Sequence, residues 1–158
     1  MNPIDIVIMA AGKGTRMKSR LPKVLQRLAG RPLLQHVLGQ ASALGARSAI
    51  VVTGHGAMEV EAACAGAISA GGQFDLKFVR QEPQLGTGHA VQQAAPLLQD
   101  DGTVVVLSGD VPLTQPGTVR ALVQASADEA LALLTVRLPD PKGYGRIVRG
   151  ADGLVRGI

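Results

Sequence analysis

The stretch IDIVIMAAGKGTRM, residues 4–17, decides the fold. Its first part, Ile4–Met9, is a run of apolar residues that hardly alternates with polar ones, which predicts a strand buried on both faces. Small residues and two glycines follow at once, from Ala10 to Gly14. Such residues let backbone N–H groups come close to a bound group, and glycine allows positive φ angles. The strand and its loop therefore predict the start of a binding site.

Short apolar runs and helical patterns alternate along the rest of the chain. Leu34, Val37 and Leu38 have the spacing of one helix face, and Gly45 is expected to end that helix. Further strands are predicted over 49–53, 76–80, 103–107 and 130–138, and short extended pieces over 146–149 and 154–158. Helices are predicted over 58–68 and 88–95. A further helix is expected after Thr114, which could cap it, with Pro116 near its start. This alternation predicts a single α/β domain over 1–158 with a mainly parallel sheet flanked by helices.

Composition excludes several classes of protein. Hydrophobic residues form 46% of the chain and charged residues 18%, so it can bury a core, and disorder is excluded as the main state. Only Phe74, Phe78 and Tyr144 are aromatic, which largely excludes the base stacking that holds single-stranded nucleic acid. The single cysteine, Cys64, excludes a disulfide framework and a cysteine-rich zinc site, and we expect a buried, inert thiol.

No apolar run approaches the roughly 20 residues that a membrane span needs. The N-terminus carries Asp5 and no basic segment before its apolar run, so it does not have the pattern of a signal peptide. We therefore expect a cytoplasmic protein without a membrane partner.

Positive charge is concentrated near the N-terminus. Residues 1–58 hold eight lysines and arginines against one acid, a balance of +7, whereas residues 59–158 hold eight against eleven, a balance of −3. Five of these bases lie within residues 13–23. A solvated loop and a nucleic-acid patch are the alternatives for such a run. Its glycines and its place directly after a buried strand favour a compact polyphosphate ligand instead.

Three loops at the carboxyl ends of predicted strands carry candidate site residues, and in open α/β sheets ligands bind at these ends. The first loop, 10–23, has neither the dinucleotide-binding nor the Walker A pattern. It supplies Arg16 and Lys23 as cations for a triphosphate, and the alternative is a structural turn.

The second loop contains Gln81, Gly86 and Thr87. A side-chain amide can read a base edge because it both donates and accepts hydrogen bonds. Alternatively, Thr87 is a helix cap and Gln81 a surface residue. The third loop, 108–112, contains Asp110, a candidate Mg²⁺ ligand, although an aspartate here can also cap its own turn. The three histidines share no metal-site spacing, and we expect neither catalysis nor zinc binding from them.

Six segments carry a resemblance to a known family. They are AAGKGTRM at 10–17, LPKVL at 21–25, LAG at 28–30, QLGTGHAVQQAAP at 84–96, GDVPL at 109–113 and GYGRI at 143–147. The first is shared by many nucleotidyltransferases, but the combination resembles the sugar-nucleotide pyrophosphorylases. Within these it is similar to the N-terminal uridylyltransferase lobe of the bacterial bifunctional N-acetylglucosamine-1-phosphate uridylyltransferase/glucosamine-1-phosphate acetyltransferases. The resemblance covers essentially the whole chain and implies a Rossmann-like nucleotidyltransferase fold.

The resemblance also implies a role for individual residues. The implied uridine-nucleotide site consists of Met9, Ala10, Ala11 and Gly12, with Gln81, Gly86 and Thr87 at the uracil. Arg16 and Lys23 would bind the phosphates, Asp110 would hold Mg²⁺ beside Ser108 and Gly109, and Gly145 would approach the sugar. Met9 replaces the usual leucine, and Ser108 stands where tyrosine is common.

The implied reaction is UMP transfer from UTP to N-acetylglucosamine 1-phosphate, which yields UDP-N-acetylglucosamine and pyrophosphate. Full-length family members also acetylate glucosamine 1-phosphate from acetyl-CoA and form homotrimers through a C-terminal half. That half and further ligands of the site are expected beyond residue 158, so we expect a truncated domain. The alternatives are a guanylyl- or cytidylyltransferase and a nucleotide-binding module without turnover. A nucleic-acid-binding role is disfavoured.

Overall fold

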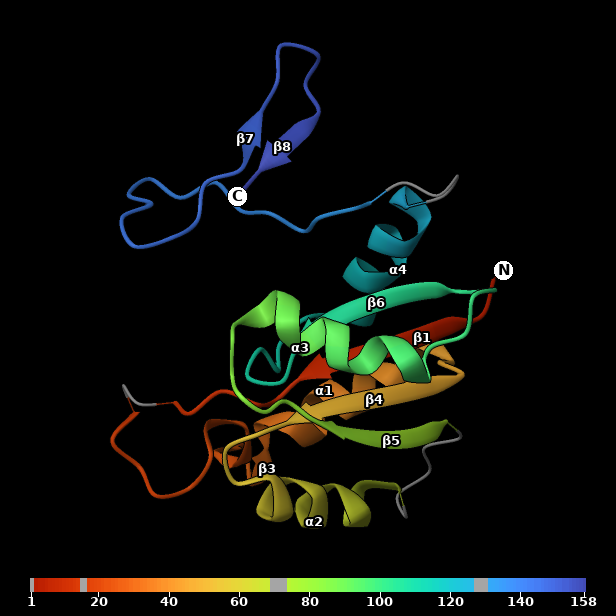
Figure 1. Ribbon diagram of the computed structural model, residues 1–158, viewed down its shortest axis with the longest axis vertical. Helices are drawn as coiled ribbons and strands as arrows, with labels where there is room; N and C mark the ends of the chain where they lie inside the picture. The colour runs from red at the N-terminus through yellow and green to blue at the C-terminus, as the bar shows by residue number, and fades with distance from the viewer. Residues whose placement is uncertain (1, 15–16, 69–73, 127–130) are drawn as a thin grey trace.

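The computed structural model describes residues 2–14, 17–68, 74–126 and 131–158. Within these residues, a four-stranded sheet of order β5-β4-β1-β6 has every strand parallel to its neighbours (Figure 1). Its strands are β1 (Ile4–Met9), β4 (Ser48–Thr53), β5 (Asp75–Arg80) and β6 (Thr103–Ser108). The helices between them are α1 (Leu33–Leu44), α2 (Ala57–Ile68) and α3 (Thr87–Ala94). The predicted α/β fold with a parallel sheet is confirmed.

Shorter elements extend this framework. They are the 3-10 helices η2 (Lys23–Leu25) and η3 (Ala95–Leu97), the hairpin of β2 (Arg27–Leu28) and β3 (Arg31–Pro32), helix α4 (Pro116–Ala125), and the hairpin of β7 (Val148–Arg149) and β8 (Val155–Gly157). No helix in the described part of the chain combines the length and hydropathy needed to cross a membrane.

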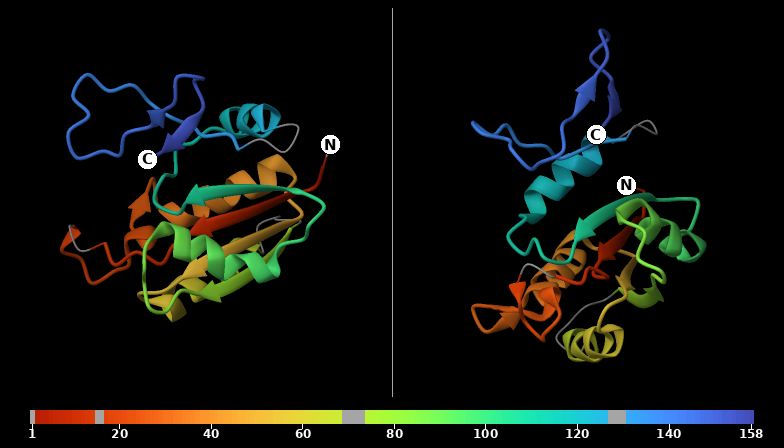
Figure 2. Two further views of the ribbon diagram at one scale, coloured as in Figure 1. Left: turned by 45° about the horizontal axis from the view of Figure 1, so that its top comes forward. Right: turned by 60° about the vertical axis from the view of Figure 1, so that its left-hand side comes forward.

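Helices bury both faces of β1. Ile6 and Ile8 belong to an apolar cluster with side chains of α1, α2 and α4, whereas Val7 packs with Ala90 and Ala94 of α3. Figure 2 shows α3 on one face of the sheet and α1 and α2 on the other. Because both faces are covered, β1 needs apolar side chains at successive positions, and this explains its non-alternating sequence.

The cysteine lies within this core. Cys64 on α2 is 1% exposed, and burial raises the pKa of its thiol to about 12. The thiol therefore stays protonated at neutral pH, and because the thiolate is the reactive form, the prediction of an inert cysteine agrees with the structure.

Two predictions concern helix ends. Gly45 ends α1 with a φ of 66°, a left-handed conformation that glycine adopts easily, so the predicted end is confirmed. The predicted cap of α4 is wrong, because the cap position is Gln115 rather than Thr114 and its side chain makes no capping hydrogen bond. Pro116 lies in the first turn, where its fixed φ suits a helix and its missing N–H costs no bond.

The predicted strand over 130–138 is also wrong. Its described part, 131–138, forms no strand, and β6 lies at the edge of the sheet. The apolar sequence favours an extended chain, but a strand also needs a partner for its backbone hydrogen bonds. Without one, Leu131 is 86% exposed and Val136 73% exposed. The β7–β8 hairpin lies beyond α4, away from the sheet (Figure 1).

At the amino end of the sheet, a buried carboxylate forms hydrogen bonds that link β1 to β4. Asp5 of β1 is 1% exposed and accepts hydrogen bonds from the guanidinium of Arg47, with its closest approach at 2.5 Å, and from the hydroxyl of Ser48 at 2.6 Å. Arg47 also bonds Asp101, which precedes β6, at 2.7 Å. The bonds from Arg47 hold the pKa of Asp5 below its ordinary value, although burial alone would raise it.

We predict that Asp5→Asn lowers the free energy of unfolding by about 2 kcal/mol at pH 7, because a charged hydrogen-bond acceptor is lost. The folded-state pKa of Asp5 is lower than its unfolded-state pKa of about 4. The ionised carboxylate therefore stabilises the fold above this unfolded-state pKa, and the stabilisation is lost as the pH falls through the folded-state pKa. Urea unfolding of both proteins across this pH range measures the difference. Asp101→Asn, at an exposed carboxylate, is the control and should cost less than about 1 kcal/mol. If the difference in unfolding free energy between Asp5→Asn and the unmodified chain stayed constant with pH, the stabilising role of the Asp5 carboxylate would be contradicted.

Candidate functional site

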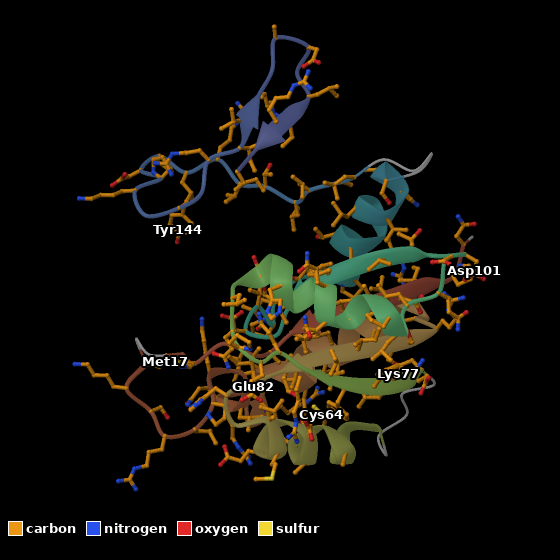
Figure 3. All side chains as sticks on the ribbon, in the orientation of Figure 1. Met17, Cys64, Lys77, Glu82, Asp101 and Tyr144 are labelled. Carbon is orange, nitrogen blue, oxygen red and sulfur yellow. The ribbon has the colours of Figure 1, made fainter. Side chains whose placement is uncertain are left out.

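A cavity of about 440 Å³ lies at the carboxyl ends of β1, β5 and β6. Met17 and Glu82 mark this edge of the molecule in Figure 3, whereas Asp101 marks the opposite edge. The described residues that line the cavity come from the end of β1, from η2 and α3, and from the three loops selected by the sequence: Met9, Ala10, Ala11, Gly12, Gly14, Met17, Lys23, Val24, Gln81, Gln84, Gly86, Thr87, Ala90, Ser108 and Asp110.

Most of the predicted site residues meet in this cavity. Those that line it are Met9, Ala10, Ala11, Gly12, Lys23, Gln81, Gly86, Thr87, Ser108 and Asp110. Gly109 lies behind the wall, where its N–H donates a 2.9 Å hydrogen bond to the carbonyl of Met9. Arg16 lies outside the described residues. The parallel sheet thus brings together loops that are about 90 residues apart in the sequence.

Gly145 is not part of the cavity wall. A Cβ placed on it would lie 3.0 Å from Ile158, at the far end of the chain. Its neighbour Tyr144 is drawn apart from Met17 and Glu82, in the loop before the β7–β8 hairpin (Figure 3). The loop around Gly145 is held by internal hydrogen bonds, since the Arg146 guanidinium donates to the carbonyls of Pro141 and Tyr144. The implied contact of Gly145 with a sugar remains a prediction.

Glycine makes the first loop compact. Gly14 has a φ of +59°, and a Cβ there would lie 2.9 Å from the Cβ of Lys23. A larger residue would therefore be strained by its backbone and would also push against the start of η2. The absence of a side chain at this position lets the loop pack against the lysine that lines the cavity.

The second loop presents a buried amide. Gln81 is 5% exposed, its backbone N–H donates to the carbonyl of Thr53 at 2.8 Å, and its side-chain Nε2 donates to the carbonyl of Gly86 at 2.8 Å. Gly86, with a φ of +100°, is the cap residue of α3, and Thr87 is the first helical residue and makes no capping bond. The alternatives of a surface glutamine and a threonine cap are therefore wrong.

An ion pair stabilises the strand ends beneath this loop. The carboxylate of Glu61 on α2 accepts hydrogen bonds from Thr53 at 3.1 Å and from Arg80 at 3.3 Å. The bonds from Arg80 hold the pKa of Glu61 below its ordinary value. Glu61 thus stays ionised and joins the ends of β4 and β5 next to Gln81.

The third loop places an acid opposite a base. Asp110 forms an ion pair with the Nζ of Lys23, and the two side chains are 28% and 38% exposed. Apart from this pair, the Asp110 carboxylate makes no hydrogen bond in the described part of the chain, so the alternative that it caps its own turn is wrong. Both charged groups are accessible from the cavity and can be separated by an anionic ligand with its cation.

A second groove, of about 880 Å³, runs along β6, α4 and residues 131–134. It is larger than the cavity, but its described lining residues include no aspartate, glutamate, lysine, arginine or histidine. A charged substrate would find no ionic partner there. The smaller cavity is therefore the candidate site.

Sequence reasoning missed some residues that shape the site. Gly54 lies so close to the first loop that a Cβ there would be 2.9 Å from the Cβ of Ala11 and 2.6 Å from the amide of Gln84. The signal was present in the turn Gly54–Gly56 after β4, but its partners become visible only when the strands are assembled. His89, whose ring nitrogens contact Gln81 and Gln93, was also missed.

This cavity combines backbone-lined glycine loops, a lysine and an aspartate at the carboxyl edge of a parallel sheet, an arrangement suited to a phosphorylated ligand with a cation. Residues 6–145 match the MobA-like NTP transferase domain, and the chain belongs to that family. It is also 78% identical over its full length to the Bifunctional protein GlmU of Acidovorax sp. (strain JS42). The predicted resemblance is therefore confirmed. The chain spans about a third of the length of the curated relatives it matches.

Solved structures agree with this assignment. A nucleotidyl transferase from Methanothermobacter thermautotroptrophicus is 27% identical, with a TM-score of 0.63 over 78% of this chain and 58% of that one. A UDP-glucose pyrophosphorylase from Acinetobacter baumanii has a TM-score of 0.67 at 22% identity, over 78% of this chain and 52% of that one. The second similarity shows the fold alone.

We predict that Gly54→Ala lowers the free energy of unfolding by about 1–3 kcal/mol, because the added methyl group meets the backbone of Ala11. The shift of the first loop should also weaken binding of nucleoside triphosphates. Gly39→Ala, on an exposed face of α1 with nothing within 4 Å of the new Cβ, is the control and should stabilise the chain slightly. Urea unfolding and titration calorimetry measure the two effects. Equal behaviour of the two variants would contradict the role assigned to Gly54.

Proposed function

We propose that this chain transfers UMP from UTP to N-acetylglucosamine 1-phosphate, giving UDP-N-acetylglucosamine and pyrophosphate. The observation that carries the proposal is the single cavity in which a glycine-rich loop, the amide of Gln81 and the Lys23–Asp110 pair meet. The 78% identity to a bifunctional GlmU protein over all 158 residues supports this choice of substrates. The proposal treats residues 1–158 as one catalytic unit, with UTP and a sugar phosphate as partners and a cytoplasmic location.

The reaction needs alignment rather than a general base. The nucleophile is a phosphate monoester oxygen, and since the second pKa of such a group is about 6, it is already mostly dianionic at pH 7. This oxygen forms a bond to the α-phosphorus of UTP, while the bond to the bridging oxygen of the β-phosphate breaks and pyrophosphate leaves with the electron pair. The protein must hold two anions in line and neutralise their charge.

Each predicted site residue has a part in this proposal. The backbone from Met9 to Gly12 lies against the nucleotide, and Gln81, Gly86 and Thr87 lie against the base. Lys23, freed from Asp110 by the incoming phosphates, stabilises the negative charge that develops on the α-phosphate and the leaving group. Arg16 is assigned the same role from the resemblance, and Ser108 and Gly109 support the loop that carries Asp110. Gly145 is assigned to the sugar.

The residues present fit a magnesium ion. Asp110 is the one carboxylate among the described lining residues, and no group of three or more potential metal-binding side chains occurs in the described part of the chain. Mg²⁺ suits such a site because it binds through one or two carboxylates and takes its other ligands from phosphates and water. When bound, the ion neutralises phosphate charge and orients the triphosphate.

Binding affinities for nucleotides test the proposal. Titration calorimetry with UTP, CTP, GTP and ATP, each with Mg²⁺, should give a clear preference for UTP. Preference for GTP or CTP would instead favour a guanylyl- or cytidylyltransferase. Binding of UTP without pyrophosphate release on addition of N-acetylglucosamine 1-phosphate would favour a nucleotide-binding module.

We predict that Lys23→Ala lowers turnover, measured as pyrophosphate release, by roughly 10²- to 10³-fold, the range seen when one donor to a developing negative charge is removed. Lys77→Ala is a matched control, since Lys77 is also paired with a carboxylate, that of Asp75 at 3.0 Å, but lies outside the cavity wall. Its turnover should equal that of the unmodified chain. Unchanged turnover in Lys23→Ala would remove this lysine from the mechanism.

A further inference from the structure

Two amides and an imidazole form a row beside the cavity. The side-chain Nε2 of Gln81 lies 3.2 Å from the Nδ1 of His89, and the Nε2 of His89 lies 3.0 Å from the side-chain Nε2 of Gln93. His89 and Gln93 are four residues apart on α3 and therefore lie on the same helix face. Only Gln81 of the three lines the cavity.

The carbonyl of Gly86 identifies which end of the Gln81 amide faces it. A carbonyl oxygen only accepts hydrogen bonds, so the group 2.8 Å from it must be the NH₂ of Gln81. The same NH₂ faces the Nδ1 of His89, and an amide nitrogen does not accept. Nδ1 must therefore be the unprotonated nitrogen of the ring, which accepts the second hydrogen of the Gln81 NH₂.

An unprotonated Nδ1 determines the hydrogen bond between His89 and Gln93. A neutral imidazole has one donor and one acceptor nitrogen, so the Nε2 of His89 carries the hydrogen. Gln93 must then present its carbonyl oxygen to Nε2. Its amide can turn to do so, because it makes no other hydrogen bond in the described part of the chain.

With both NH₂ hydrogens engaged, the Oε1 of Gln81 is the atom left for a ligand. No donor from the described residues reaches this oxygen, although the side chain is 5% exposed and lines the cavity. An oxygen in this position accepts hydrogen bonds and cannot donate them. It complements a base whose edge carries an N–H, such as N3–H of uracil, and it repels the unprotonated N3 of cytosine.

We propose that His89 is a positioning residue that selects uracil over cytosine by holding the Gln81 amide in one orientation. This inference rests on the proposed function for the identity of the substrate. If His89 could not accept through Nδ1, the Gln81 amide would be held by the carbonyl of Gly86 alone, and turning its NH₂ to the cavity would cost less. The site would then tolerate CTP.

Packing alone does not require a histidine at position 89. Helix α3 is attached to the sheet through Ala90 and Ala94, which are 3% and 0% exposed and belong to the apolar cluster on that face. His89 is only half-buried and touches the site through its ring nitrogens. Its two hydrogen bonds are therefore the property to be tested.

A pair of variants separates the hydrogen bond from the packing. His89→Asn keeps an acceptor oxygen near the position of Nδ1, whereas His89→Leu keeps similar bulk without any acceptor. Titration calorimetry with UTP and with CTP, each with Mg²⁺, gives the ratio of their dissociation constants. We expect His89→Asn to keep the ratio within about threefold, and His89→Leu to lower it about tenfold to a hundredfold, the effect of one mispaired buried polar group. Gln92→Leu, at an exposed neighbouring position on α3, is the control and should keep the ratio.

Nuclear magnetic resonance tests the assignment without any ligand. In the chain labelled with ¹⁵N-histidine, long-range ¹H–¹⁵N correlations report which ring nitrogen carries hydrogen, and the signals of His89 are those lost in His89→Asn. We expect Nε2 to be protonated and Nδ1 to be bare. A protonated Nδ1, or a UTP preference that survives in His89→Leu, would overturn the inference and leave the proposed function standing. Absence of a UTP preference in the unmodified chain would instead overturn the proposed function.

Discussion

Parallel pairing of β1 with β4 on one side and β6 on the other is the constraint on which the rest of the structure depends. Parallel strands end at the same edge, so the loops after β1, β5 and β6 must open on one side of the sheet. The same pairing leaves β1 buried on both faces and accounts for its apolar sequence. It also separates two kinds of polar residue: the Asp5–Arg47 network stabilises the amino edge, and the ligand-facing groups gather at the carboxyl edge.

Much of this arrangement could be predicted from the sequence because it depends on local patterns. Apolar runs identify the strands of the sheet, helical spacing and Gly45 identify α1, and the motifs after three strands identify most of the cavity wall. These signals succeed because the residues of a buried strand or a glycine loop are restricted by their own backbone environment.

The remainder depends on partners that sequence patterns do not specify. An apolar run such as 131–138 has the composition of a strand but pairs with none in the described part of the chain. Gly54 acquires its importance from Ala11 and Gln84, which reach it only in the folded state. The spacing of the histidines predicts no role for His89, yet its ring contacts glutamines before and after it in the chain. Gly145 matched a motif, but its loop lies outside the cavity wall.

Transfer of the α-phosphorus of UTP is the most direct test of the proposed uridylyltransferase. The chain would be incubated with Mg²⁺, N-acetylglucosamine 1-phosphate and UTP labelled at the α-phosphate, and the products would be separated by chromatography. The account predicts that the label appears in UDP-N-acetylglucosamine, with one pyrophosphate released for each sugar nucleotide formed. Label that remains in UTP, or that is released as free UMP by hydrolysis, would contradict it.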